Sequence, residues 1–199
     1  MRTKKLLATA SVLAAVAVAG AAPTALASQP ASHGTAARPD FSAQAARAGL
    51  SIGQEKTLQR RVDGYLAAHP GSKQTAANTV ADPTGSHMVF AVPGEKYARD
   101  LNSGWSGSDP RTPAHTCPYG DFCAYSGANY TGDYRNWGRC ATYEIPDGWG
   151  SGGSWYNNQT HGLQAVMRNK AHQPIYVTPP APSGDPHGNW GPVWYVTNC

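Results

Sequence analysis

The chain has 199 residues and a formal net charge of +4, and its 22 glycines and 16 prolines exceed the usual share of about 12% for these two residues. This composition favours turns and short strands over long helices. The positive charge does not indicate nucleic-acid binding. Three of the cations lie in the first five residues, and the remaining Lys and Arg are scattered singly without forming a basic stripe.

Residues 1–27 have the pattern of a secretory signal peptide. Three cations precede an apolar run over residues 6–22, and a small-x-small cleavage pattern follows at residues 25–27. The alternative is an uncleaved membrane anchor, but Pro23 follows the run at once and no stop-transfer flank is present. We therefore expect a secreted, extracellular protein that does not bind a membrane after signal cleavage.

The next segment changes character near Ser51. Residues 28–50 have few large apolar side chains and predict a flexible leader. Ser51 and Gln54 then have the spacing of a capping box, and an apolar helical face follows until the chain reaches His69, Pro70 and Gly71. The pattern predicts one short amphipathic helix.

A hairpin is expected after this helix. Residues 74–81 and 87–92 have strand character, and the sequence Asp-Pro-Thr-Gly at 82–85 between them suits a turn. Helix and hairpin form a small α+β unit over residues 51–101, which could be a pro-segment, a folding aid or a spacer. The polar, turn-rich residues 102–113 predict a linker after it.

Residues 114–199 are predicted to form the folded core domain, because they hold all four cysteines, five of the six tryptophans and eight of the ten tyrosines. Short aromatic or β-branched runs alternate with turn residues, and no helix of about ten residues fits between them. We expect an all-β antiparallel sandwich or barrel. The expected strands cover residues 122–125, 141–145, 163–168, 175–178 and 193–196.

Four cysteines in an exported chain predict two disulfides, because the compartment is oxidising. Zinc binding is the competing interpretation. Cys117 and Cys123 lie six residues apart rather than in a Cys-x-x-Cys knuckle, and no His pair has the usual spacing. Three pairings are possible, and we favour Cys117 with Cys123 across a Pro-Tyr-Gly turn and Cys140 with Cys199.

One motif has a definite structural meaning. Tyr125, Tyr130 and Gly132 are spaced as aromatic, four residues, aromatic, one residue, glycine, which predicts paired rings over a folded hairpin and a positive φ at Gly132. A second segment, residues 156–163, places two Asn residues before two spacers and an apolar strand. Together these segments resemble the Greek keys of the βγ-crystallins.

A closer resemblance covers residues 117–199. The order Cys-Pro-x-Gly-x-Phe-Cys, Tyr-x-x-x-x-Tyr-x-Gly, a third Cys, Trp-x-Asn-Asn-Gln-Thr and a tryptophan-rich tail ending in Cys resembles secreted actinobacterial metalloproteinase inhibitors with a βγ-crystallin-like fold. The elements at 65–67 and 93–95 are similar to the leader region of such proteins. The resemblance implies a disulfide-stapled Greek-key sandwich and an inhibitor rather than an enzyme. In that family a rigid loop enters the cleft of a thermolysin-like zinc protease and presents a peptide bond to the metal in substrate-like fashion.

The position of such a loop is not marked by a motif. Residues 178–190 are the longest strand-poor stretch of the domain, and four prolines stiffen it. The alternative is a simple strand connector. Family members brace their loop with a local disulfide, whereas no cysteine lies between residues 141 and 198 here. The candidate inhibitory residues are Thr178, Pro179, Pro180, Ala181, Pro182 and Ser183.

Calcium is the one cofactor that the resemblance suggests. Asn157 and Asn158 match the crystallin segment whose oxygens bind Ca²⁺, which suits a hard cation. In the crystallin segment a hydroxyl residue that also supplies a ligand follows the two spacers. Here His161 stands at that position, and nitrogen is a poor calcium ligand. Otherwise the two asparagines are turn residues.

No enzyme motif is present. The sequence has no His-Glu-x-x-His, Gly-x-Ser-x-Gly or phosphate-binding glycine loop. We expect a monomer whose partner is an extracellular protease. The competing function is carbohydrate or cell-wall binding, or a toxin-like activity, through a stacking face of tryptophans, unless most of these rings fill the core. The tryptophans concerned are Trp137, Trp149, Trp155, Trp190 and Trp194.

Overall fold

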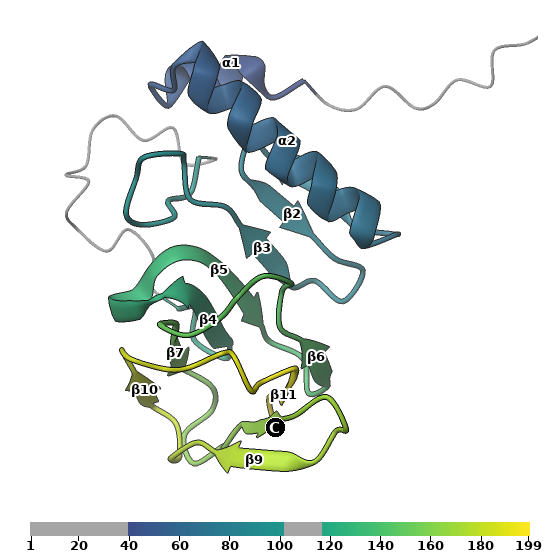
Figure 1. Ribbon diagram of the computed structural model, residues 1–199, viewed down its shortest axis with the longest axis vertical. Coiled ribbons are helices and arrows are strands. Elements are labelled where there is room, and N and C mark those ends of the chain that lie inside the picture. The colour runs from purple at the N-terminus through teal and green to yellow at the C-terminus, as the bar shows by residue number, and fades with distance from the viewer. Residues whose placement is uncertain (1–39, 102–116) are drawn as a thin grey trace, which may run out of the picture. The chain divides into compact units, whose positions relative to one another are not determined.

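The computed structural model describes residues 40–101 and 117–199 (Figure 1). The predicted signal peptide, most of the predicted leader and the predicted linker at 102–113 lie outside these residues. The described part contains two helices, a 3-10 turn and eleven strands. Their bounds are α1 (Ser42–Arg47), α2 (Ile52–Ala68), β1 (Lys73–Ala76), β2 (Thr79–Ala81), β3 (His87–Val89), β4 (Phe122–Gly127), η1 (Ala128–Tyr130), β5 (Thr131–Trp137), β6 (Thr142–Glu144), β7 (Ser154–Asn157), β8 (Val166–Arg168), β9 (Pro174–Val177), β10 (Ser183–Asp185) and β11 (Tyr195–Thr197).

The strands form two sheets in which every pairing is antiparallel. One sheet has seven strands in the order β1-β2-β3-β5-β4-β7-β10, and the other has four in the order β6-β11-β8-β9. The prediction of a mainly antiparallel β fold is confirmed. All five expected strands are present with bounds shifted by a few residues, while β5, β7 and β10 were not expected.

Helix α2 begins as the sequence predicts. The Ser51 hydroxyl accepts a hydrogen bond from the Gln54 N–H at 3.3 Å, and the Gln54 side chain accepts one from the Ser51 N–H at 2.9 Å. This reciprocal pair satisfies two N–H groups that the first turn leaves unpaired. Leu58 and Val62 then face inward, so that the helix covers the strands beside it (Figure 1).

The expectation of a flexible leader over residues 28–50 is wrong for its last part. Residues 42–47 form α1, and Ala45 is buried against the same core as α2. Phe41, Ala48 and Leu50 pack around it. Small and medium apolar residues three or four positions apart give this short helix one buried face, which the low overall hydrophobicity concealed.

The expected strand over residues 74–81 is divided by a turn at Ala77 and Asn78, so that β1 pairs with β2. Asn78 is fully buried, and its amide donates to the carbonyls of Phe90 at 2.9 Å and Arg99 at 2.8 Å. A buried side chain that satisfies distant backbone acceptors favours the turn over a continuous strand.

Residues 117–199 build a core between the two sheets. Phe122 on β4 stacks between Trp137 and Trp155, with ring centroids 6.0 Å and 5.8 Å away. Met167 and Val196 from the four-stranded sheet face the same cluster. Aromatic rings thus supply much of the buried area of a domain made of short strands.

The unit predicted over residues 51–101 does not stand apart from this domain. Strand β3 pairs with β5 through His87 to Asn136, Met88 to Arg135 and Val89 to Tyr134. The hairpin therefore extends the sheet of the C-terminal domain.

Candidate functional site

The candidate inhibitory segment, residues 178–183, joins β9 in the four-stranded sheet to β10 in the seven-stranded sheet (Figure 1). It therefore connects two strands that belong to different sheets. Thr178 and Ala181 are buried, whereas the three prolines of the segment are exposed and Ser183 is partly exposed. Whether it can also contact a partner depends on how firmly the two buried residues are held.

Thr178 is the first anchor and is fully buried. Its N–H donates to the Ala165 carbonyl at 2.9 Å, and its hydroxyl accepts from the Ala165 N–H at 2.9 Å. The Asn157 amide donates to the same hydroxyl at 3.5 Å, and the Gln164 amide donates to the Thr178 carbonyl at 2.7 Å. Backbone and side chain of Thr178 are therefore both fixed.

Ala181 is the second anchor and is 1% exposed. Its N–H donates to the Leu163 carbonyl at 2.8 Å, and its carbonyl accepts from the Gly162 N–H at 3.1 Å. The Ser183 hydroxyl donates to the Pro179 carbonyl at 2.9 Å and closes the turn from its other side. Six hydrogen bonds thus join Thr178 and Ala181 to the rest of the domain, and a seventh closes the turn within the segment.

The residues between and after these anchors are prolines that face solvent. Pro179, Pro180 and Pro182 are exposed. Proline has no N–H and a fixed φ, so this turn leaves no unpaired donor and has little conformational freedom to lose on binding. Hydrogen bonds and proline rings therefore hold this segment in one conformation.

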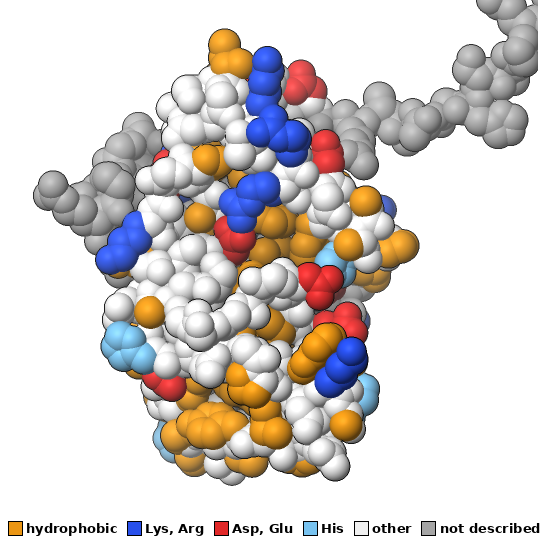
Figure 2. All heavy atoms as spheres, in the orientation of Figure 1, with side chains coloured by type: hydrophobic (Ala, Val, Ile, Leu, Met, Phe, Trp, Pro, Cys, Tyr) orange, Lys and Arg blue, Asp and Glu red, His pale blue; other side chains and the backbone are white. Residues whose placement is uncertain are grey.

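The strand that leads into the segment also has an unusual surface. Strand β9 lies at the edge of its sheet and all four of its residues are exposed. Ile175, Tyr176 and Val177 are 42–50% exposed, and Leu163, whose carbonyl holds Ala181, is 41% exposed. Figure 2 shows hydrophobic side chains gathered at the lower end of the molecule, where Figure 1 places β9. An apolar surface therefore adjoins the candidate segment.

The sequence predicted a strand at residues 175–178 but not that its side chains would be exposed. Pro174, at the start of the strand, was the available signal, because a residue without an N–H is tolerated mainly on edge strands.

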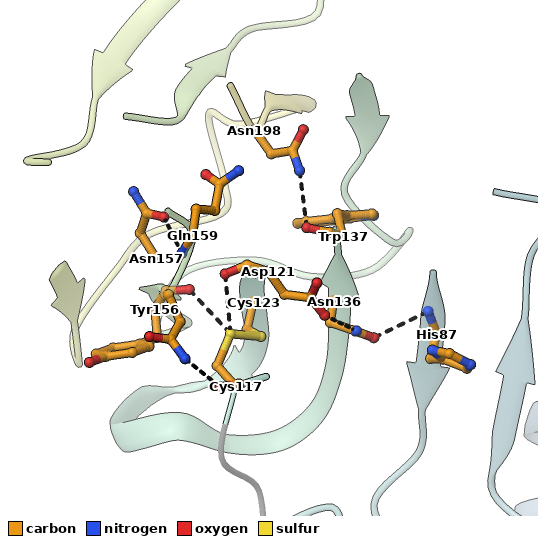
Figure 3. Close-up of a disulfide and its surroundings, with 11 residues drawn as sticks. His87, Cys117, Asp121, Cys123, Asn136, Trp137, Tyr156, Asn157, Gln159 and Asn198 are labelled. Atoms are coloured by element: carbon orange, nitrogen blue, oxygen red, sulfur yellow. Dashed lines mark hydrogen bonds between the residues drawn. A yellow bond between two sulfur atoms is a disulfide. The ribbon is translucent and has the colours of Figure 1, made fainter. Parts of the chain in front are cut away.

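The disulfide pairing favoured from the sequence is confirmed. Cys117 pairs with Cys123 at a Cα–Cα distance of 5.8 Å, and Cys140 pairs with Cys199 at 5.3 Å. The first bridge closes the turn before β4 (Figure 3). The Asn158 amide donates to the Cys117 carbonyl there at 2.8 Å. Beside the second bridge, Asn198 donates to the Trp137 carbonyl at 3.0 Å and fixes the C-terminus to the core.

The hairpin motif has the predicted geometry. The rings of Tyr125 and Tyr130 meet edge to face with centroids 5.3 Å apart, and Gly132 has a φ of +77°. A Cβ at Gly132 would collide with the Ser126 hydroxyl, which instead accepts a hydrogen bond from the Asp133 N–H at 2.8 Å. Burial raises the pKa of Tyr125 well above its ordinary value. Tyr125 is buried and Tyr130 and Gly132 are partly exposed, so the motif is a structural element of the hairpin.

The asparagines proposed for calcium serve separate parts of the structure. Asn157 is fully buried, its side-chain oxygen Oδ1 accepts from the Gln159 N–H at 3.3 Å, and its side-chain amide donates to the Leu163 carbonyl at 3.0 Å. Asn158 instead holds Cys117. Residues 154–162 contain no carboxylate, and no group of three or more His, Cys, Asp or Glu side chains placed to hold a metal occurs in residues 40–101 and 117–199. These donors do not fit a strong calcium site.

Most of the tryptophans fill the core. Trp137, Trp155 and Trp190 are at most 3% exposed, and Trp149 is partly buried against the same cluster. Trp194 is 44% exposed, and the Lys170 ammonium lies 4.6 Å from the centroid of its ring. A broad stacking face is therefore not formed by these five residues.

The remaining observations concern the compartment and the relatives of the chain. Two disulfides are consistent with an oxidising extracellular environment. Neither helix in the described ranges has the length and apolarity needed to cross a bilayer. Comparison with protein-family models, with curated proteins and with solved structures finds no match to this chain.

Proposed function

We propose that the protein is an extracellular peptidase inhibitor and that residues 178–183 contact the active cleft of a thermolysin-like zinc protease. The observation that carries the proposal is the pair of buried anchors, Thr178 and Ala181, around two exposed prolines. The proposed domain fold is the crystallin-like Greek-key sandwich that the motif order resembles.

Rigidity is the property that an inhibitory segment needs. A loop already held in its bound shape loses little conformational entropy on binding, so more of the contact energy appears as affinity. Hydrogen bonds from Thr178 and Ala181 to the neighbouring strand and loop supply this rigidity in place of a disulfide. A protease that attacks the segment also meets proline nitrogens, which offer no N–H for strand pairing.

The adjoining apolar surface supports the same proposal. Interfaces that bind tightly have an apolar core rich in aromatic residues. Tyr176 is 44% exposed and its ring centroid lies 6.2 Å from that of Trp155 in the core, so the exposed ring is backed by a packed one. Its neighbours Ile175 and Val177 widen this surface.

The test is a titration of a thermolysin-like protease with the full secreted chain, using an internally quenched peptide substrate. We expect activity to fall toward zero near equimolar inhibitor. Undiminished activity at a large molar excess of the folded chain contradicts the proposal for this protease class.

A variant pair assigns the contact to the segment. Replacing Pro179 and Pro180 by Ala frees two backbone positions, each worth about 0.4–1 kcal/mol, so the inhibition constant should rise by about tenfold. Pro192→Ala is the matched control, because Pro192 is an exposed proline outside the segment. Equal inhibition by all three proteins would exclude residues 178–183 as the contact.

Polysaccharide binding is tested on the same material. Retention on chitin or cell-wall glucan that is lost in Trp194→Ala, together with unchanged protease activity, would favour the binding-protein alternative. The exposed ring of Trp194 is the one residue of the five that supports it.

A further inference from the structure

The edge of β5 that does not pair with β4 is covered along its length by residues 87–98, which belong to the N-terminal segment, residues 40–101. Strand β3 pairs with Tyr134, Arg135 and Asn136. Further along, the Gly132 N–H donates to the Lys96 carbonyl at 2.8 Å, and the Gly132 carbonyl accepts from the Ala98 N–H at 3.2 Å. The contact therefore has the form of a strand added to the edge of an existing sheet.

Asp133 holds the centre of this contact. One carboxylate oxygen accepts from the Ala91 N–H at 2.8 Å, and the other forms an ion pair with Arg61 on α2. Arg61 also donates to the Ala91 carbonyl at 3.0 Å. A single carboxylate of the C-terminal domain thus joins both the extended segment and the helix of the N-terminal segment.

A second ion pair also joins β5 to the N-terminal segment, but here β5 supplies the cation and the N-terminal segment supplies the carboxylate. Arg135 on β5 donates to Asp82 at 2.9 Å, and the two side chains are only 8% and 13% exposed. Thr84 and Ser86 donate to the other oxygen of Asp82, which fixes the carboxylate in place. Asn136 adds a contact by accepting from the His87 N–H at 3.2 Å.

The two ion pairs make the contact specific in register. Asp133 and Arg135 are two residues apart on one strand, whereas their partners, Arg61 and Asp82, come from the helix and the hairpin turn. A segment that slid along the edge of β5 would separate both pairs and bring like charges closer. Arg135 and Asp82 form the more buried of the two pairs, since the Arg61 side chain is 38% exposed, and buried pairs favour one arrangement over others in some proteins.

Apolar side chains also pack between β5 and the N-terminal segment. Val89, Ala91 and Ala98 from the N-terminal segment form a buried cluster against Tyr134 of β5. Burial raises the pKa of Tyr134 well above its ordinary value, so the phenol stays neutral at this contact.

We propose that the edge of β5 is a strand-binding site whose ligand is the segment 87–98 of the same chain, presented with Arg61 and Asp82. The association of residues 40–101 with residues 117–199 does not depend on the covalent connection between them. A chain that is cut between residues 102 and 116 therefore remains a non-covalent complex of residues 117–199 with the N-terminal fragment.

The experiment inserts the recognition sequence of a site-specific protease between residues 102 and 116 of the full chain. The folded protein is cut, diluted to about 1 µM and passed over a size-exclusion column, with native mass spectrometry of the peak. We expect both fragments in one species with the mass of the uncut chain plus the one water that hydrolysis adds. Elution of two separate fragments overturns the proposal without the need for any variant.

Variants test whether the ion pairs act as described. Asp133→Asn should raise the dissociation constant of the two fragments by at least about tenfold, since hydrogen bonds to a charged group are the strong ones. Arg61→Gln should have a similar effect, and the double variant should be little weaker than either single one. Asp147→Asn is the matched control, because Asp147 is exposed. An equal effect of the control, or full additivity of the pair, contradicts the assigned roles.

Discussion

The two halves of the protein reach a stable core by different means. Residues 40–101 bury a mainly aliphatic cluster under a helix, with Leu58, Val62 and Val80 among its members, and contain no cysteine. Residues 117–199 bury aromatic rings between sheets of short strands and add two disulfides. The comparison shows that a long amphipathic helix and covalent bridges are alternative ways to compensate for strands that are mostly three or four residues long.

The largest expected effect comes from removing the long-range bridge of the aromatic half. Cys140 and Cys199 are 59 residues apart, and closing a loop of this length restricts the unfolded chain by about 4 kcal/mol. The double Ser variant should lose about that much unfolding free energy in urea denaturation. The Cys117 and Cys123 double variant is the control, because its six-residue separation predicts a loss of only about 2 kcal/mol. Equal losses would refute the loop-length argument.

A cavity in the aliphatic half should cost somewhat less. Leu58→Ala removes a side chain that is 1% exposed and should lower the unfolding free energy by about 3 kcal/mol. Because β3 continues the sheet of the other half, we expect one cooperative transition by both far-ultraviolet and tryptophan signals. Ile52→Ala, at a residue 72% exposed, is the control and should change little. Two separate transitions would mean that the halves unfold independently.

The hairpin glycine permits a finer comparison. Gly148 and Gly132 both have positive φ, but a Cβ at Gly148 meets no atom within 4 Å. Gly148→Ala should therefore cost about 1 kcal/mol for the backbone conformation alone. Gly132→Ala should cost about 2 kcal/mol or more, since the Ser126 hydroxyl must also move. Similar losses in thermal denaturation would show that the close contact relaxes freely.

The smallest expected effect is the pH dependence of the stabilisation that the ion pair between Asp82 and Arg135 contributes to the contact between the halves. Burial raises the pKa of Asp82, but hydrogen bonds from Thr84 and Ser86 and the charge of Arg135 outweigh it, so the net pKa lies below its ordinary value. The resulting stabilisation is present above about pH 4, near the unfolded value, and is lost as the pH falls through the lower folded value. The difference in unfolding free energy between wild type and Asp82→Asn should shrink over this range. A difference independent of pH would exclude the carboxylate as its source.

The sequence determined the features that depend on neighbouring residues. The capping box at Ser51, the turn at 82–85, the short disulfide and the positive φ at Gly132 all follow from local geometry. Each of them depends on a missing Cβ or on groups no more than six residues apart along the chain.

Tertiary structure decided the features that depend on distant partners. The sequence of β5, Thr-Gly-Asp-Tyr-Arg-Asn-Trp, has little strand character, yet it lies inside the sheet because β3 and β4 pair with it on both sides. The anchoring of Thr178 by Asn157 and Ala165, and the ion pair of Arg61 with Asp133, likewise join residues more than ten positions apart. Such contacts form only when the fold brings their groups together, so periodicity and spacing along the chain do not reveal them.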